Sequence, residues 1–138
     1  MLKRRTTIAL GLGAATVALM PRAAVASAFD AAVESFTHGA PLGQGGLTIT
    51  TPGIAENGNA VPIELEAAGA EEIALFAPAN PVPAVARFRF GPAAGTARTA
   101  TRIRLAMSQE LLAIARMTDG SFVQAVAAVE VTVGGCAE

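Results

Sequence analysis

The chain has 138 residues, of which 52% are hydrophobic and only 15% charged, and its formal net charge is −1. This length fits one small domain, and the charge lacks the basic excess typical of nucleic-acid-binding proteins. A single Cys excludes an intrachain disulfide, and one Cys with one His cannot supply a zinc site of the Cys/His kind. No apolar run reaches the roughly 18 residues of a membrane-spanning helix.

Residues 1–28 predict an export signal peptide. A positive stretch, Lys3–Arg5, precedes the apolar stretch Ile8–Met20, and small residues follow up to residue 28. This order is typical of a signal peptide, with cleavage expected after Ala26 or Ala28. The alternative is an amphipathic helix of the mature protein, which is disfavoured because the charges lie only at the edges of the segment.

The pair Arg4-Arg5 favours the twin-arginine route over the general secretory route. The twin-arginine route carries folded cargo, and the expected destination is the periplasm. Removal of the signal leaves a chain without Lys, in which six Arg stand against 11 acidic residues and give a formal net charge of −5. The mature protein is therefore expected to be small, acidic and not attached to a membrane.

The mature domain is expected to begin with a short amphipathic helix over Phe29–Thr37. Phe29, Val33 and Phe36 recur at spacings of three and four residues, which places them on one helical face. Gly39 and a nearby Pro end the pattern.

The rest of the domain, up to residue 133, predicts short antiparallel strands. Pro and Gly cut it into pieces in which apolar and polar residues alternate, and Asp119-Gly120 between two such pieces is a strong hairpin signal. About seven strands predict that residues 29–133 form an all-β, immunoglobulin-like antiparallel sandwich. The expected strands are Val61–Glu66, Ile73–Phe76, Ala86–Phe90, Thr101–Met107, Leu111–Met117, Phe122–Val126 and Val129–Val133.

No constellation of catalytic residues is visible, so enzymatic activity is not expected. His38 is expected to be a solvated loop residue, and Glu71-Glu72 a solvated strand edge and not an acid/base pair. Four Arg residues alternate with apolar residues on two expected strands. They predict a solvated face, with an anion-binding or partner-docking stripe as the alternative, and they are Arg87, Arg89, Arg102 and Arg104.

Cys136 is the candidate reactive residue of the sequence. A free Cys is normally buried in a core, but this one follows Gly134-Gly135 in a stretch that could not bury it. The two Gly residues remove side-chain restrictions, so residues 134–138 are expected to form a flexible arm. From the residues alone, a working thiol remains open beside two alternatives, an accidental Cys and an intermolecular disulfide.

Several stretches, taken together, resemble the SoxY family, the sulfur-carrying subunits of the bacterial thiosulfate-oxidising system. The resemblance covers most of the mature domain, and no single stretch would be specific by itself. The stretches are Glu56–Ile63, Asn80-Pro81, Pro83–Phe90, Thr101–Ala106, Ala115–Phe122 and Val131–Cys136. The expected immunoglobulin-like fold and the expected twin-arginine signal agree with that family.

The resemblance implies a carrier without enzymatic activity and without a metal or other resident cofactor. Cys136 would hold the sulfur substrate covalently, as an S-thiosulfonate and related persulfides, and Gly134 and Gly135 would be the hinge of the arm. The implied partner is a SoxZ-like subunit that forms a heterodimer and crosses the membrane with this chain. The arm would serve a haem-containing conjugating enzyme, a sulfate-releasing hydrolase and a sulfur dehydrogenase.

The end of the sequence departs from the family pattern, because Ala137-Glu138 stands where the family has Gly-Gly. Negative charge beside the thiol opposes its ionisation and repels anionic thiosulfate, and the added bulk hinders entry into a narrow site. We therefore hypothesise a carrier with altered partners or substrate. The alternative function is a periplasmic interaction module of the same fold with a vestigial thiol, and Cys136→Ser separates the two.

Overall fold

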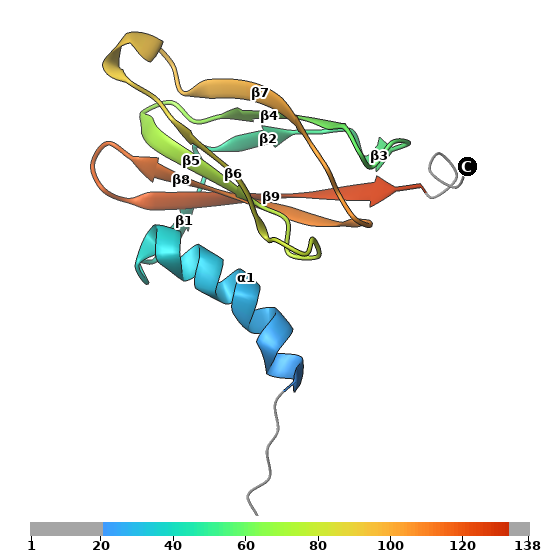
Figure 1. Cartoon of the computed structure of the whole chain (residues 1–138). Helices are drawn as coiled ribbons and strands as arrows, with labels where there is room; N and C mark the ends of the chain where they lie inside the picture. Colours follow the sequence, from blue (N-terminus) through green and yellow to red (C-terminus); the bar gives the residue numbers. More distant parts are fainter. Residues whose placement is uncertain (1–20, 133–138) are drawn as a thin grey trace, which may run out of the picture.

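The computed structural model describes residues 21–132, with side chains from residue 28 onward, and the C-terminal part of this range is a β-sandwich (Figure 1). Predictions that concern residues 1–20 and 133–138 fall outside the described residues. One α-helix, α1 (Pro21–Thr37), precedes the strands, and a short 3-10 helix, Pro92–Ala94, lies between two of them. Within the described range, no helix is both long and apolar enough to cross a membrane.

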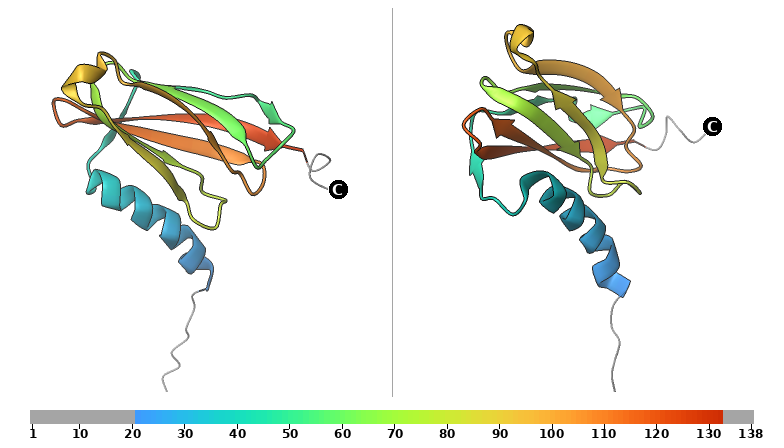
Figure 2. Two further views of the ribbon diagram at one scale, coloured as in Figure 1. Left: turned by 45° about the horizontal axis from the view of Figure 1, so that its top comes forward. Right: turned by 60° about the vertical axis from the view of Figure 1, so that its left-hand side comes forward.

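The strands form two sheets that face each other, and α1 lies against the outer side of the larger sheet (Figure 2). The larger sheet has the order β1 (Leu42–Gln44), β9 (Phe122–Val131), β8 (Gln109–Met117), β5 (Ala70–Phe76) and β6 (Ala84–Arg89), and β3 (Ile54–Ala55) also pairs with β9. The smaller sheet has the order β2 (Thr48–Thr50), β4 (Val61–Glu66) and β7 (Arg98–Ile103). This architecture confirms the expected immunoglobulin-like sandwich.

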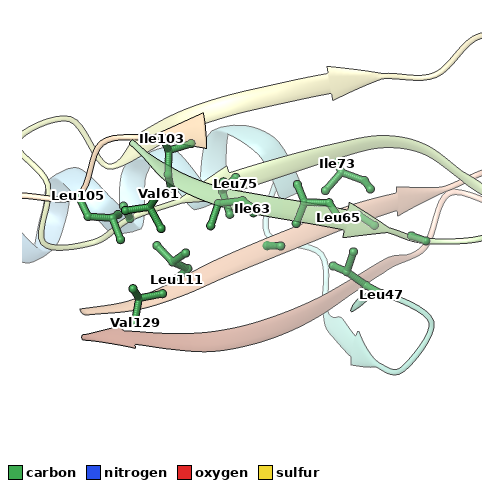
Figure 3. Packing of buried hydrophobic residues seen from close by; sticks show 14 of the residues in the cluster. Leu47, Val61, Ile63, Leu65, Ile73, Leu75, Ile103, Leu105, Leu111 and Val129 are labelled. Carbon is green, nitrogen blue, oxygen red and sulfur yellow. The ribbon is translucent and has the colours of Figure 1, made fainter. Parts of the chain in front are cut away.

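The main core lies between the sheets, and the alternation in β4 shows how the sequence builds it. Val61, Ile63 and Leu65 are buried while the residues between them are exposed, because successive side chains of a strand point to opposite faces. They pack toward Leu75 and Leu111 of the larger sheet (Figure 3). Each such side chain contributes about 1.5–3 kcal/mol when it is fully buried.

A second, smaller core joins α1 to the outer face of the larger sheet. The ring of Phe36 meets the rings of Phe76 and Phe122 edge to face, with centroid distances of 6.4 and 5.6 Å. Such pairs add to the energy of apolar burial. The helix expected over Phe29–Thr37 is therefore present, and its apolar face is the one that packs.

The helix starts earlier than expected, at Pro21 and not at Phe29. Proline is well tolerated in the first turn of a helix, and the Ala-rich residues that follow it have high helix propensity. In the uncleaved chain, α1 therefore runs through both expected cleavage points, after Ala26 and after Ala28.

Most expected strands begin or end at other residues than predicted, and two differences are large. Phe122–Val126 and Val129–Val133 are parts of one strand, β9, because Ala127 and Ala128 continue the pairing with β8 opposite Leu111 and Glu110. The strand expected over Thr101–Met107 covers Arg98–Ile103 instead. Three very short strands, β1 to β3, were missed because two or three residues carry no periodicity.

The hairpin between β8 and β9 confirms the turn signal. Gly120 has a φ of +89°, which favours Gly, and the Met117 amide donates to the Ser121 carbonyl at 2.8 Å. The Asp119 carboxylate accepts hydrogen bonds from the Ser121 hydroxyl at 2.6 Å and from its amide at 2.9 Å. These bonds favour the ionised form and lower the pKa of Asp119.

Candidate functional site

The candidate site is the end of β9, because this strand leads directly toward Cys136. The last described residue is Thr132, so Gly134, Gly135 and Cys136 themselves lie outside the described residues. What the structure shows is the anchorage of the chain just before the predicted arm. We call residues 130–132, with the groups that hold them, the arm base; Figure 1 shows β3 beside this end of β9.

On one side, the arm base is held by the segment around β3. Ile54 and Ala55 pair in parallel with Glu130 and Val131. The Glu130 amide donates to the Gly53 carbonyl at 2.8 Å, and the Thr132 amide donates to the Ala55 carbonyl at 3.1 Å. These two bonds fix the direction in which the chain leaves the sandwich.

On the other side, the hydroxyl of Ser108 makes the hydrogen bonds to Val131 that a neighbouring strand would otherwise make. The Val131 amide donates to Oγ of Ser108 at 2.8 Å, and the same hydroxyl lies 3.4 Å from the Val131 carbonyl, to which it can donate. β8 begins only at Gln109, so backbone pairing does not cover this amide. Each bond of this kind contributes about 0.5–1.5 kcal/mol. Sequence reasoning missed Ser108, because a single serine in a loop gives no signal.

The loop that carries Ser108 is held by Asn80. Its side-chain NH₂ donates to the Arg104 carbonyl at 2.8 Å, and its Oδ1 accepts from the Ala106 amide at 2.9 Å. Gln109 adds a third bond, from Nε2 to the same Oδ1 at 3.0 Å. These contacts explain why β7 ends at Ile103: the following residues bond to the β5–β6 loop instead of extending the strand.

Gly58 lies between the loop and the arm base. The Leu105 amide donates to the Gly58 carbonyl at 2.8 Å. A Cβ at position 58 would lie 2.9 Å from both the Leu105 carbonyl oxygen and Cγ1 of Val131. The backbone approaches closely here, and only a residue without a side chain fits.

A hollow of about 500 Å³ lies beside the arm base. Its lining comes from the segment around Gly58, from the β7–β8 loop and from the end of β9. Leu105 is buried in its wall, whereas Met107 is 55% exposed. We call this space the arm-base hollow, and its lining residues are Gly58, Asn59, Arg104, Leu105, Ala106, Met107, Ser108, Val131 and Thr132.

Most of the stretches on which the family resemblance rests come together at this end of the sandwich. Gly58, Asn80, Arg104 and Val131 belong to four different stretches and meet around the arm base. The stretch Ala115–Phe122 does not, because its hairpin lies at the opposite end of β9, and Pro83–Phe90 runs along β6 to the same opposite end, where the Phe90 amide bonds to the Glu71 carbonyl.

The predicted face of four Arg residues does not exist as one surface. Arg87 and Arg89 are on β6 of the larger sheet, whereas Arg102 is on β7 of the smaller sheet and Arg104 follows it. All four residues are exposed, as expected of solvated side chains. The alternative of a single stripe was wrong, because alternation within two strands cannot show that the strands belong to different sheets.

Glu72 contradicts the expectation of a solvated strand edge. It lies on β5 opposite Arg89 on one side and Arg116 on the other, and it is only 2% exposed. Its carboxylate oxygens lie 3.3 Å from Nε of Arg87, 3.7 Å from Nε of Arg89 and 3.4 Å from an Nη of Arg116. A buried charge requires such partners.

Glu72 and its three arginine partners form an ion-pair cluster that connects neighbouring strands. The Arg87 guanidinium also lies 5.1 Å from the centre of the Phe36 ring, a cation–π distance. Glu72 thereby links β5, β6 and β8, and through Arg87 it supports the packing of α1. Glu71 is 46% exposed at its side chain and pairs with Arg116 at 3.3 Å.

His38 is exposed at the end of α1, as expected, with a positive φ of 54°. Over residues 21–132, no group of three or more His, Cys, Asp or Glu side chains is placed to hold a metal ion.

Comparisons of sequence and structure with known proteins identify the family of this chain. It is similar to the sulfur carrier protein SoxY from Chlorobium limicola f thiosulfatophilum, with 33% identity and a TM-score of 0.67 over 78% of this chain and 98% of that structure. It shares its fold alone with a superoxide reductase (neelaredoxin) variant from Ignicoccus hospitalis, at 15% identity and a TM-score of 0.54 over 72% of this chain and 88% of that one. A search of curated proteins found no match.

The sequence model of the family described as sulfur oxidation protein SoxY matches residues 33–136, which include the sandwich, the arm base and Cys136. This match spans well over half of the chain. The chain belongs to the SoxY family of sulfur oxidation proteins.

Proposed function

We propose that this chain is a periplasmic sulfur carrier that holds oxidation intermediates covalently on Cys136. The observation that carries this proposal is the extent of the family match, which continues past the sandwich and through Cys136. Cys136 is also the one Cys of the sequence, and it stands four residues after Thr132, the last residue of the anchored arm base.

The geometry of the arm base supports a carrier function. The hydrogen bonds of Val131 and Thr132 hold the start of the arm in place. Cys136 is about 13 Å of extended chain beyond Thr132, at roughly 3.3 Å per residue. A fixed base with Gly134-Gly135 as a hinge would let the thiol enter a narrow site on another protein while the sandwich stays outside.

The chemistry begins with the thiolate, which is the nucleophilic form of Cys. In the loading step, the Cys136 sulfur forms an S–S bond with the terminal sulfur of thiosulfate. The two electrons released pass to a haem-containing conjugating enzyme. Water then attacks the sulfonate sulfur of the adduct, which releases sulfate and leaves a persulfide on Cys136 for a sulfur dehydrogenase.

We propose a SoxZ-like subunit as the partner of this chain, and a twin-arginine signal over residues 1–28 as its route of export. A pair that crosses the membrane in folded form needs a signal on only one of its members. The absence of Lys from residues 29–138 and their excess of acidic residues give the mature chain the net negative charge noted above.

A reconstituted loading reaction tests the proposal. Thiosulfate, the conjugating enzyme and the wild-type chain should reduce the haem in proportion to the amount of chain, and Cys136→Ser should abolish this reduction. Ser108→Cys/Cys136→Ser is a matched control, because it keeps one thiol but places it in the arm base. If Cys136→Ser supports the same haem reduction as the wild-type chain, the carrier proposal is wrong.

The second candidate is an interaction module whose thiol is vestigial. The observation that favours it is the ending Ala137-Glu138, which differs from the family ending. In that case Cys136→Ser would bind the partner subunit with unchanged affinity and would also restore growth on thiosulfate to a strain that lacks the chain. The carrier proposal expects unchanged binding but no growth.

A further inference from the structure

A second hollow, of about 630 Å³, lies at the end of the sandwich opposite the arm base. Its walls come from the start of β5, the end of β8 and the connection between β6 and β7. Figure 1 shows this connection and the β8–β9 hairpin at one end of the sandwich, and β3, beside the arm base, at the other. We call this space the distal hollow, and its polar lining residues are Glu71, Arg89, Thr96, Arg116 and Thr118.

The two arginines of this lining are brought together by one buried carboxylate. Arg89 and Arg116 pair with Glu72 from the strands on its two sides, at 3.7 and 3.4 Å. Arg89 makes this contact through Nε and its side chain is 79% exposed, so no ion pair within residues 28–132 uses its Nη atoms. A guanidinium group matches an oxyanion, to which it can donate two parallel hydrogen bonds.

The carboxylate of Glu71 shows which chemistry the distal hollow accepts. It lies 3.3 Å from an Nη of Arg116, while its side chain remains 46% exposed. Glu71 lies where the pairing of β5 with β8 shifts register, between Ala70 and Glu72, so no residue of β8 stands directly opposite it. Because an exposed ion pair is weak, an anion from solution can replace the Glu71 carboxylate at Arg116.

The charges of the cluster favour an anion with two negative charges. Three arginines, Arg87, Arg89 and Arg116, stand against the two carboxylates of Glu71 and Glu72, which leaves an excess of one positive charge. When Glu71 turns away to solvent, the excess rises to two. A dianion balances this excess, whereas a chloride ion does not.

We propose that the distal hollow binds a small dianionic oxyanion of the size of sulfate, held by Arg89 and Arg116. Glu71 occupies Arg116 when the anion is absent and therefore acts as an internal competitor. Thr96 and Thr118 in the same lining can donate further hydrogen bonds from their hydroxyl groups. Binding is reversible and involves no covalent step, and it adds to the chain a site separate from the arm.

The test is a titration of sulfate into the ¹⁵N-labelled chain, followed by NMR. Chloride is adjusted to keep the ionic strength constant, so that general screening does not enter. The amide signals of residues 94–97 and 116–118 should shift and give one dissociation constant. Arg89→Gln should weaken sulfate binding about two- to fivefold, the range expected for one exposed ion pair. Glu71→Gln should strengthen binding by a similar factor, because it removes the competing carboxylate.

Arg102→Gln is the matched control, because it removes the same charge from an exposed residue of β7 that does not line the distal hollow. This variant should bind sulfate as the wild-type chain does. Equal weakening by Arg89→Gln and Arg102→Gln would overturn the proposal, and so would shifts that gather at residues 102–106 instead. An unchanged affinity in Glu71→Gln would refute the role of Glu71 as a competitor. None of these measurements involves Cys136, so their failure and a failure of the carrier function are distinguishable.

Discussion

The close approach of the backbone at Gly58 allows a quantitative prediction for Gly58→Ala. The added Cβ would lie 2.9 Å from the Leu105 carbonyl oxygen and from Cγ1 of Val131. Real Cβ atoms do not come this close, so either the β7–β8 loop or the arm base has to move. Over-packing of this kind costs about 1–3 kcal/mol. For a domain of about 100 residues, each kcal/mol lowers Tm by about 4 °C or more, so a fall of about 4–12 °C is expected.

Gly91→Ala is the matched control, because its Cβ would have no atom within 4 Å and its φ is −84°. Thermal unfolding followed by circular dichroism should show a change of at most about 0.5 kcal/mol for this variant. Hydrogen exchange should also show faster exchange of the Val131 and Thr132 amides in Gly58→Ala. If Gly58→Ala and Gly91→Ala unfold at the same temperature, the inferred close packing at the arm base is refuted.

Three other changes probe contacts that the sequence did not reveal. Ser108→Ala removes the acceptor of the Val131 amide, so the unfolding free energy should fall by about 0.5–1.5 kcal/mol, with faster hydrogen exchange at Val131; unchanged exchange would contradict the role of this hydroxyl. Glu72→Ala should lower the free energy of unfolding in urea by about 1–2 kcal/mol, a value reduced for the solvent exposure of its Arg partners. Glu64→Ala, at an exposed ion pair, should lower it by less than about 0.5 kcal/mol. Equal losses in the two variants would contradict a structural role for the buried Glu72 carboxylate. The lowered pKa of Asp119 stabilises the fold above its unfolded pKa of about 3.9, and this contribution is lost as pH falls through the folded pKa. Asp119→Asn should therefore lose less stability than wild type on acidification below about pH 4, and identical acid profiles would exclude this contribution.

The sequence predicted those parts of the fold that follow from local patterns. Alternation in Val61–Glu66 gave a strand with the correct bounds and the correct buried face. The Asp119-Gly120 turn gave the hairpin between β8 and β9. In each case, a few neighbouring residues determine the structure without help from distant parts of the chain.

The parts that were missed depend on residues far apart in the sequence. Glu72 is buried because β6 and β8 bring arginines to both of its sides, which the sequence around Glu72 does not show. Ser108 matters because β9 returns to it after a separation of 23 residues. β9 was divided in two because Ala127 and Ala128 give weak strand signals, although their pairing with β8 is regular.

Only the residues of the predicted arm could be identified from the sequence as candidate functional residues. Cys136, Gly134 and Gly135 stood out in the sequence, and the family match includes all three positions. The anchorage of the arm base was not predictable, since Asn80, Ser108 and Gly58 come from three separate loops and meet only in the folded chain.

The central claim is that Cys136 carries sulfur covalently. Intact mass spectrometry of the chain, isolated from the periplasm of cells supplied with thiosulfate, tests it most directly. We expect an adduct that is removed by reductant, that maps to Cys136 and that is absent from Cys136→Ser, with a mass that identifies the sulfur species. A bare thiol or a simple disulfide dimer under these conditions, in cells that contain the conjugating enzyme, would contradict the carrier function.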